Sequence, residues 1–208
     1  MIFFSISSTK YYMNKNVRNI IEKNFGESIK IKTDVLNSNL IDQIAKVGLS
    51  VIDCLQSRGK IFFAGNGGSF ADSQHLAAEF ISKFLFERDA LPAIALGTNS
   101  SNMSAIGNDY GYKNVFSREL FALGSKNDIF IPITTSGNSE NLIEAVITAN
   151  NVGLRSIALT GATGGALNEL CECIKIPSTN VPRIQECHIL IGHLLCQIAE
   201  ESIFKTKS

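Results

Sequence analysis

The stretch KIFFAGNGGSFADSQHLAAEFISK, residues 60–83, decides the fold of this chain. It opens on a short apolar run at 61–64, which has the length and composition of a buried strand. A turn with three glycines follows at 65–69, and these glycines permit positive φ values and a close approach of the backbone to a ligand. Neither Pro nor Gly interrupts residues 69–83, so a helix is expected there.

A strand, a glycine turn and a helix in this order predict an anion site, because a helix N-terminus offers unpaired N–H groups and the positive end of its dipole. Ser69 can add a hydroxyl as cap or ligand. Further along, His75 and Glu79 share one helix face, with Asp72 nearby. The segment therefore predicts a phosphate site beside an acid/base or metal pair. The alternative is a tight turn before a helix with a solvated His–Glu pair.

Composition narrows the class of protein. The 208 residues are 45% hydrophobic and 18% charged with zero net charge, which predicts one globular domain with a sizeable core. Without a dense Lys/Arg stripe or a long apolar run, neither nucleic-acid binding nor a membrane span is expected. The first residues lack a basic start, a long apolar stretch and a cleavage-like site, so a signal peptide is not expected there. Together with the cysteine usage described next, this predicts a cytoplasmic protein.

The five cysteines are odd in number and lack a spaced framework, which predicts reduced thiols. Cys171 and Cys173 lack a second pair with zinc spacing and are interpreted as structural. Residues 1–13 are interpreted as a tail or an alternative start. Residues 14–208 are expected to form a single domain, with N-terminal helices at 14–58 and an α/β core at 59–208.

Helices and strands are expected to alternate along the rest of the chain. Helical periodicity covers 14–57, where Gly26 is expected to separate two helices that also pack against another subunit. A turn-rich loop is expected at 107–112 and helices at 114–123, 140–150, 167–171 and 183–204. Strands are expected at 61–64, 91–96, 128–133, 155–160 and 173–176. This order predicts an α/β three-layer sandwich with a five-stranded parallel sheet, whose ligands bind at the carboxyl ends of the strands.

The loop TTSGNS at 134–139 is the second polar feature at a strand end. Four of its six residues carry hydroxyls, and a helix follows. Hydroxyls and helix N–H groups together bind phosphate without a cation. A helix cap formed by Asn138 or Ser139 would explain one hydroxyl but not four. We therefore expect this loop and the glycine turn to converge on one crevice.

The last helix carries two of the three histidines. Gln185 and His193 are separated by about 80° around the helix at 100° per residue, so both can reach one site. His188 falls on a different side and is interpreted as a core residue. Gly192 leaves room beside His193.

At these residues the chain resembles the sugar isomerase (SIS) family, and within it the members that isomerise heptose phosphates. The similar segments follow the family's order over about residues 25–204: AGNGGS at 64–69, AxxQHxAAEF at 71–80, LPAIAL at 91–96, AIGNDYGYxxVFSREL at 105–120, TSGNSxN at 135–141, LTGxxGG at 159–165 and RIQExH at 183–188, with His193. Thr134 departs from the family's usual Ser, and Phe70 is bulky beside the phosphate turn.

The resemblance implies a SIS fold of the flavodoxin-like type, assembled as a homotetramer with active sites at subunit interfaces. Glu79 and His193 are implied as the catalytic pair. Substrate contacts are implied for Asn66, Gly67, Gly68, Ser69, Glu79, Asn108, Asp109, Thr134, Thr135, Ser136, Ser139 and Gln185. One zinc ion per subunit and no nucleotide are implied, with His75, Glu79, Gln185 and His193 as the metal ligands.

The reaction that the resemblance implies converts D-sedoheptulose 7-phosphate into D-glycero-D-manno-heptose 7-phosphate through an enediol, for heptoses of the bacterial surface such as those of lipopolysaccharide or capsule. Glu79 would move the proton between C1 and C2, and His193 would open the sugar ring or shuttle the hydroxyl proton. Zinc on the same side chains would instead act as a Lewis acid, and the sequence leaves both roles open. The rival is a non-catalytic SIS tetramer that binds a protein or senses a sugar phosphate. A dinucleotide-binding protein is disfavoured because the GxGxxG spacing is absent.

Overall fold

The computed structural model describes residues 15–205, so the tail expected at residues 1–13 lies outside the described part of the chain. The elements follow in the order α1 (Lys15–Leu36), α2 (Leu40–Gln56), β1 (Ile61–Gly65), α3 (Gly68–Ile81), β2 (Ala93–Ala95), α4 (Ser100–Tyr110), η1 (Tyr112–Asn114), α5 (Val115–Leu123), β3 (Ile129–Ile133), α6 (Glu140–Val152), β4 (Arg155–Thr160), η2 (Gly165–Glu169), β5 (Glu172–Lys175) and α7 (Val181–Phe204).

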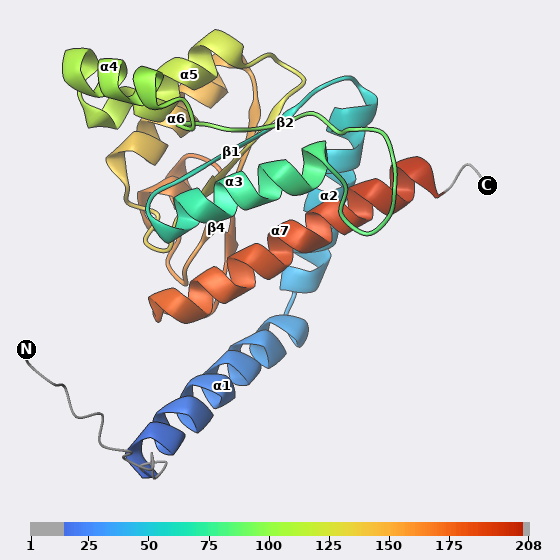
Figure 1. The fold of residues 1–208 in the computed structure, drawn as a ribbon, viewed down its shortest axis with the longest axis vertical. Helices are drawn as coiled ribbons and strands as arrows, with labels where there is room; N and C mark the ends of the chain where they lie inside the picture. The colour runs from blue at the N-terminus through green and yellow to red at the C-terminus, as the bar shows by residue number, and fades with distance from the viewer. Residues whose placement is uncertain (1–14, 206–208) are drawn as a thin grey trace, which may run out of the picture.

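The five strands form one parallel sheet in the order β2-β1-β3-β4-β5. Every residue of β1 and β3 is buried, as expected where helices cover both faces of a sheet. Alternate side chains point to opposite faces: Ile61 and Phe63 pack with α2, α3 and α7, whereas Phe62 and Ala64 pack with α5 and α6. Figure 1 shows these layers. The predicted three-layer α/β sandwich is confirmed.

The order of the strands in the sheet indicates where a ligand site is expected. The chain leaves β1 toward β2 on one side and later adds β3 on the other, so the order changes direction between β1 and β3. A crevice at the carboxyl ends of the strands is expected at such a switch point. The glycine turn follows β1 and the hydroxyl loop follows β3, and the two strand ends pair as Gly65 with Ile133. Both polar loops therefore emerge at one edge of the sheet.

The prediction that Gly26 separates two helices is wrong, because α1 runs through it. One internal glycine costs a helix only about 1 kcal/mol. Docking on α7 offsets that cost: Ser28 donates to Glu186 at 2.6 Å, and Arg183 donates to the carbonyl of Asn24 at 2.7 Å. The break comes at residues 37–39 instead, where the Ser38 hydroxyl accepts the Leu40 N–H.

The loop predicted at 107–112 is also wrong for its first four residues, because α4 continues to Tyr110. Asn99 starts this helix by accepting the N–H groups of Ser101 and Asn102 at 3.0 and 3.1 Å. At the other end, the Arg118 guanidinium lies 3.6 Å from the centre of the Tyr110 ring. Gly111, at φ 81°, then ends the helix.

The strand predicted at 91–96 is shorter than expected, with β2 limited to Ala93–Ala95. Pro92 has no N–H for the ladder, which limits pairing on that side. The predicted reduced thiols are confirmed, since all five cysteines are free.

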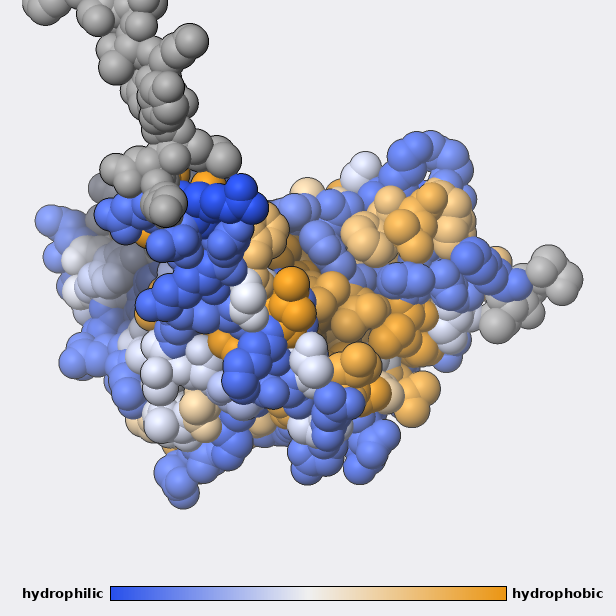
Figure 2. All heavy atoms as spheres, turned by 90° about the horizontal axis from the view of Figure 1, so that it is seen from below, coloured by the Kyte–Doolittle hydropathy of each residue, from blue (hydrophilic) through white to orange (hydrophobic). Residues whose placement is uncertain are grey.

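Helix α1 projects away from the layered body (Figure 1). Its outer part exposes apolar side chains at helical spacing, namely Val17, Ile20, Ile21, Phe25 and Ile29. Figure 2 shows a further gathering of hydrophobic residues between α1 and the C-terminus. In residues 15–205, none of the helices combines the length and the hydropathy that crossing a membrane requires.

Candidate active site

Helices α3 and α7 lie side by side and run in the same direction (Figure 1). At their N-terminal ends, a Cβ added to Gly68 would lie 2.7 Å from the Gln185 amide nitrogen. Two turns further on, a Cβ at Gly192 would overlap the methyl groups of Leu76. Glycines at both points let the helices approach closely, and this approach brings the polar groups of the two helices together.

Three polar side chains meet across this seam. His75 Nε2 lies 3.0 Å from Glu79 Oε1 along α3. His193 comes from α7, and its ring centre lies 5.1 Å from that of His75 in an edge-to-face arrangement. One ligand atom from each of the three residues lies within 4.8 Å of the other two. Spacing predicted His75 and Glu79 on one face, and the family resemblance implied His193 beside them. The structure brings these three side chains together, although His193 lies more than a hundred residues further along the chain.

Burial and neighbouring charge tune this cluster. Burial and the adjacent His75 lower the pKa of His193, while Glu79 and Asp72 act in the opposite direction. The pKa of Asp72 is raised by burial, against the opposing effect of His75 and His193. A neutral imidazole near neutral pH can accept a proton from a sugar hydroxyl and return it. The cluster thus pairs a carboxylate with a neutral base.

The same side chains fit a divalent metal. Two imidazoles and one carboxylate are a common donor set for zinc. His193 Nε2 is buried and has no hydrogen-bond partner among the described residues, so it has a lone pair or a proton to share. Gln185 lies beside Gly68, and the eight residues that separate it from His193 span about 12 Å of helix. Gln185 therefore stands nearer the glycine turn than the cluster.

The glycine turn has the backbone that the sequence predicts. Gly67 has φ 56° and ψ −120°, a conformation that requires glycine, and it caps α3 without a side chain. Ser69 is buried in the first turn of that helix. Asn66 exchanges two hydrogen bonds with Asn141 of α6, each of 2.9 Å, and this exchange ties the turn to the helix after the hydroxyl loop. This contact sets the glycine turn beside the first turn of α6, and a crevice shared by the two loops stays a prediction.

The hydroxyl loop is partly self-supporting. Thr134 is buried and accepts the Gly137 N–H at 3.2 Å, and Ser136 accepts the Asn138 N–H at 3.1 Å. Ser139 occupies the N-cap position of α6, but its side chain makes no capping bond. Thr135 is half-buried between them. The hydroxyl of Ser139 can therefore serve an anion instead of the helix.

Two predicted substrate contacts lie apart from this site. Asn108 and Asp109 are exposed on α4, in the opposite layer of the sandwich, where Asn108 donates to Asp109 at 2.7 Å. They line a polar hollow of about 500 Å³ with three serines of the same helix. Within one chain, the described contacts do not connect them to Glu79 or His193.

His188 is fully buried, and its Nε2 lies 3.1 Å from the Thr160 carbonyl. The interpretation of this histidine as a core residue is confirmed. Burial lowers its pKa to about 4.

Sequence reasoning missed three neighbours of the site. Tyr112 donates to Asn66 at 3.3 Å, Asn141 pairs with the same residue, and the ring of Phe84 stacks on His193 with centres 5.2 Å apart. Tyr112 and Asn141 stand within the segments quoted for the resemblance, which was the available signal. Phe84 lies outside them, and no pattern in its own segment points to a role.

Comparison with known proteins gives the same picture along the chain. The sequence model of a family described as the SIS domain matches residues 24–161. Phosphoheptose isomerase 2 of Campylobacter jejuni is 50% identical over 192 residues, which cover 91% of this chain and 96% of that protein. Phosphoheptose isomerase of Aneurinibacillus thermoaerophilus is 49% identical over 189 residues, which cover 90% of this chain and 96% of that protein.

Solved structures of two phosphoheptose isomerases also match the fold of this chain. A phosphoheptose isomerase from Francisella tularensis matches with a TM-score of 0.85 and 38% identity, over 88% of this chain and 97% of that one. A phosphoheptose isomerase from Neisseria gonorrhoeae matches with a TM-score of 0.83 and 38% identity, over 89% of this chain and 99% of that one.

Proposed function

This chain belongs to the SIS domain family, and we propose that within it the protein is an isomerase that interconverts D-sedoheptulose 7-phosphate and D-glycero-D-manno-heptose 7-phosphate. The observation that carries the proposal is the meeting of Glu79 and His193 from separate helices, next to two loops suited to phosphate. Near-complete coverage of similar phosphoheptose isomerases supports it. The protein then serves heptose biosynthesis, and we place its product in surface polysaccharides such as lipopolysaccharide or capsule.

The reaction moves one proton between the adjacent carbons C1 and C2 and a second proton between the oxygens that these carbons carry. Glu79 takes the proton from C1 as a carboxylate and returns it to C2, so that an enediol forms between the two steps. His193 moves the hydroxyl proton, because its lowered pKa keeps the imidazole neutral at physiological pH. His75 contacts Glu79 at 3.0 Å and orients the carboxylate.

The phosphate end of the substrate is held at the N-terminal end of the seam. Asn66, Gly67, Gly68 and Ser69 contribute from the glycine turn, and Thr134, Thr135, Ser136 and Ser139 from the hydroxyl loop. Helix N-termini favour a dianion at this position. Binding energy from the unreactive phosphate then holds C1 and C2 in reach of the cluster, which lowers the barrier.

We also propose that zinc binds in the cluster, because His75, Glu79 and His193 supply suitable donors and His193 Nε2 lacks a partner among the described residues. Gln185 completes the ligand set if its side chain turns along the seam. When bound, the ion supplies Lewis-acid polarisation of the sugar oxygens. The protein's own residues remain responsible for binding the phosphate, orienting the sugar and moving protons.

The assembly proposed is a homotetramer with sites at subunit interfaces. The exposed apolar stripe of α1 supports it, since an unpartnered apolar stripe of this size usually marks a contact surface. Asn108 and Asp109 would then complete the site of a neighbouring copy. A cytoplasmic location suits a phosphorylated substrate and five free thiols.

Oligomerisation is testable at one residue. Phe25 is 68% exposed on α1, so Phe25→Glu should lower the mass in light scattering if this stripe is the contact. Lys23→Glu on the same helix is the matched control, because it introduces the same side chain without removing an apolar contact. A tetramer that persists in the Phe25 variant would place the interface elsewhere.

The isomerase is tested with purified protein and sedoheptulose 7-phosphate, with shorter ketose phosphates as controls. Glu79→Gln keeps size and hydrogen bonding but removes the base, so kcat should fall by about 10²–10⁴-fold. The matched control is Glu169→Gln, an exposed carboxylate of η2, which should leave kcat unchanged. Full turnover of the Glu79 variant would contradict the assigned role. A wild-type protein that binds the sugar phosphate without turnover would favour the non-catalytic sensor or adaptor.

A further inference from the structure

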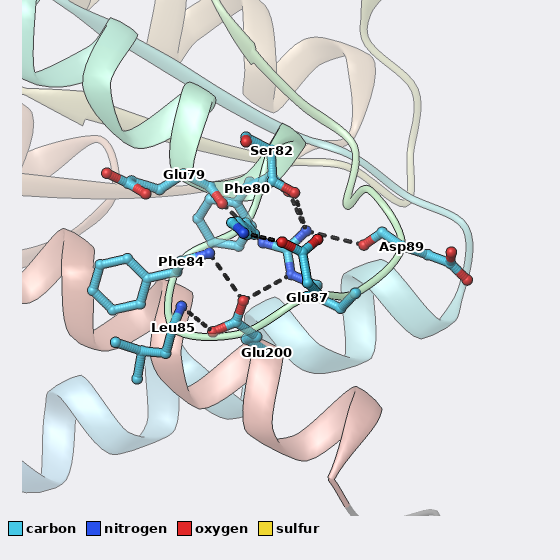
Figure 3. Close-up of polar contacts among 10 residues, drawn as sticks. Glu79, Phe80, Ser82, Phe84, Leu85, Glu87, Asp89 and Glu200 are labelled. Atoms are coloured by element: carbon cyan, nitrogen blue, oxygen red, sulfur yellow. Dashed lines mark hydrogen bonds and ion pairs between the residues drawn. The ribbon is translucent and has the colours of Figure 1, made fainter.

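A buried ion pair lies next to the cluster, between α7 and the segment 82–92 that links α3 to β2. Arg88 Nε lies 3.0 Å from Glu200 Oε1, and the two side chains are 1% and 0% exposed. Figure 3 shows Glu200 of α7 pointing into the turn of this segment. Two charges withdrawn from water at this depth are costly unless their remaining hydrogen bonds are satisfied, so the partners of each charge are informative.

Glu200 fixes the start of the segment. Its two carboxylate oxygens accept the N–H groups of Phe84 at 3.0 Å and of Leu85 at 2.8 Å. Burial alone would raise the pKa of Glu200, but these N–H donors and Arg88 hold it below its usual value. Glu200 therefore stays ionised, and its two oxygens hold the backbone at residues 84 and 85.

Arg88 fixes the end of α3. It donates to the carbonyl of Glu79 at 2.8 Å and to that of Phe80 at 2.7 Å. These carbonyls belong to the last turn of the helix, where no further helical N–H is available to pair with them. The guanidinium thus replaces the missing turn at the residue that carries the base.

Both ends of the ion pair therefore act on the acid/base residues. The backbone of Glu79 is held by Arg88, and the ring of Phe84, held by Glu200, stacks on His193 with an interplanar angle of 30°. Glu200 lies seven residues after His193, close to two full turns, and so projects from the same face of α7. One buried contact is thereby linked to both partners of the proposed proton transfer.

We propose that the Arg88–Glu200 pair is a positioning device that sets the distance and orientation between Glu79 and His193. An ion pair at this depth contributes little net stability compared with apolar packing, so its value lies in the geometry that it imposes. The glycine turn lies at the opposite end of α3, and the hydrogen bonds described for Arg88 and Glu200 do not reach either phosphate loop. The inference rests on the proposed isomerase activity for its kinetic consequence, but its structural content is independent of that activity.

The test combines kinetics with a signal from His193. Phe84→Leu removes the ring without removing a buried charge, and Arg88→Lys keeps the charge but cannot make the same set of hydrogen bonds. Each variant should lower kcat roughly ten- to a hundredfold, because small misplacements of reacting groups cost about that much. KM for the sugar phosphate should change by less than about twofold, because the phosphate loops are remote.

The spectroscopic readout is the imidazole Cε1–H resonance. With three histidines in the chain, the His193 signal is readily assigned, and the Phe84 ring current shifts it upfield. The signal should move downfield in both variants. Faster amide exchange at Phe84 and Leu85 should accompany it in Arg88→Lys.

Lys60→Met is the matched control. It breaks a partly buried ion pair, Lys60 Nζ–Asp128 Oδ2 at 2.7 Å, next to the start of β1. It should lower thermal stability yet leave kcat and the His193 signal as in wild type. Folded Phe84 and Arg88 variants with wild-type kcat and an unshifted signal would overturn the positioning role, as would a loss of stability alone. An inactive wild-type protein would overturn the proposed function instead, and the His193 signal would still decide this inference.

Discussion

Gly192→Ala tests whether the close approach of α3 and α7 holds the cluster together. The added methyl overlaps both terminal methyl groups of Leu76, and the Cγ of Leu76 lies 2.9 Å away. Leu76 is fully buried, so its side chain has no open space into which it can turn. The two helices must therefore separate, and His193, the next residue, moves away from His75 and Glu79.

Two opposing terms set the effect on the free energy of unfolding. Replacing Gly by Ala inside a helix gains about 1 kcal/mol. Overpacking a core costs about 1–3 kcal/mol. The sum is a net loss of about 0–2 kcal/mol, which leaves the protein folded at room temperature. The effect on kcat should be larger than the effect on stability, because a displacement of about 1 Å at a reacting group can lower the rate by about a hundredfold.

The assay is a double-mutant cycle with urea unfolding and isomerase kinetics on each variant. Leu76→Ala alone should cost about 2–5 kcal/mol by leaving a cavity. In the double variant the methyl group added at Gly192 occupies part of that cavity, so the coupling free energy should favour the double variant by about 1–3 kcal/mol. A Gly192→Ala protein that is more stable than wild type and fully active would refute the reasoning, as would a coupling energy of zero.

Three further outcomes follow from the structure. Because the pKa of His188 falls to about 4 on folding, the unfolded chain takes up a proton at this residue before the folded chain does as the pH drops. The contribution of neutral His188 to stability should therefore be complete above pH 6.5, decline toward pH 4 and amount to roughly 3 kcal/mol. Urea unfolding at a series of pH values measures it, and His188→Gln should give a flatter profile. Gly137→Ala should raise KM more than it lowers kcat in steady-state kinetics, because Gly137 has φ 70° and its new methyl would strike the Gly164 carbonyl beside the hydroxyl loop. Tyr112→Phe should raise KM a few-fold, because it removes the hydrogen bond from Tyr112 to Asn66, and it should not lower the melting temperature.

The alternation of apolar strands with helices was enough to predict the layers, because each strand is short, apolar and bounded by turn residues. Helix interruptions were harder to predict. Gly26 reads as a break when considered alone, but contacts of α1 with α7 hold the helix through it. Tertiary contacts of this kind are invisible to local propensity, and they also lengthened α4 by packing Arg118 on Tyr110.

In the candidate site, too, some residues could be paired from the sequence, whereas others depend on tertiary packing. His75 and Glu79 could be paired from their spacing on one helix, and the two loops from their places after strands. That His193 joins them was implied by the family resemblance alone, because the packing of Gly192 against Leu76 that brings it there is visible only in the folded chain. The Arg88–Glu200 pair joins residues more than a hundred positions apart, and neither is distinguished by its neighbours in sequence.

The shared direction of α3 and α7 also gives the site a built-in scale. The anchoring turn ends at Gly68, and His75 stands about 10 Å further along at 1.5 Å per residue. In the proposed reaction, a ketose phosphate held by its phosphate reaches the near edge of the His75–Glu79–His193 cluster only if its carbon chain spans that interval. A sugar one carbon shorter falls short by up to a bond length, about 1.5 Å, so rigid helices rather than contacts to individual hydroxyls would reject it.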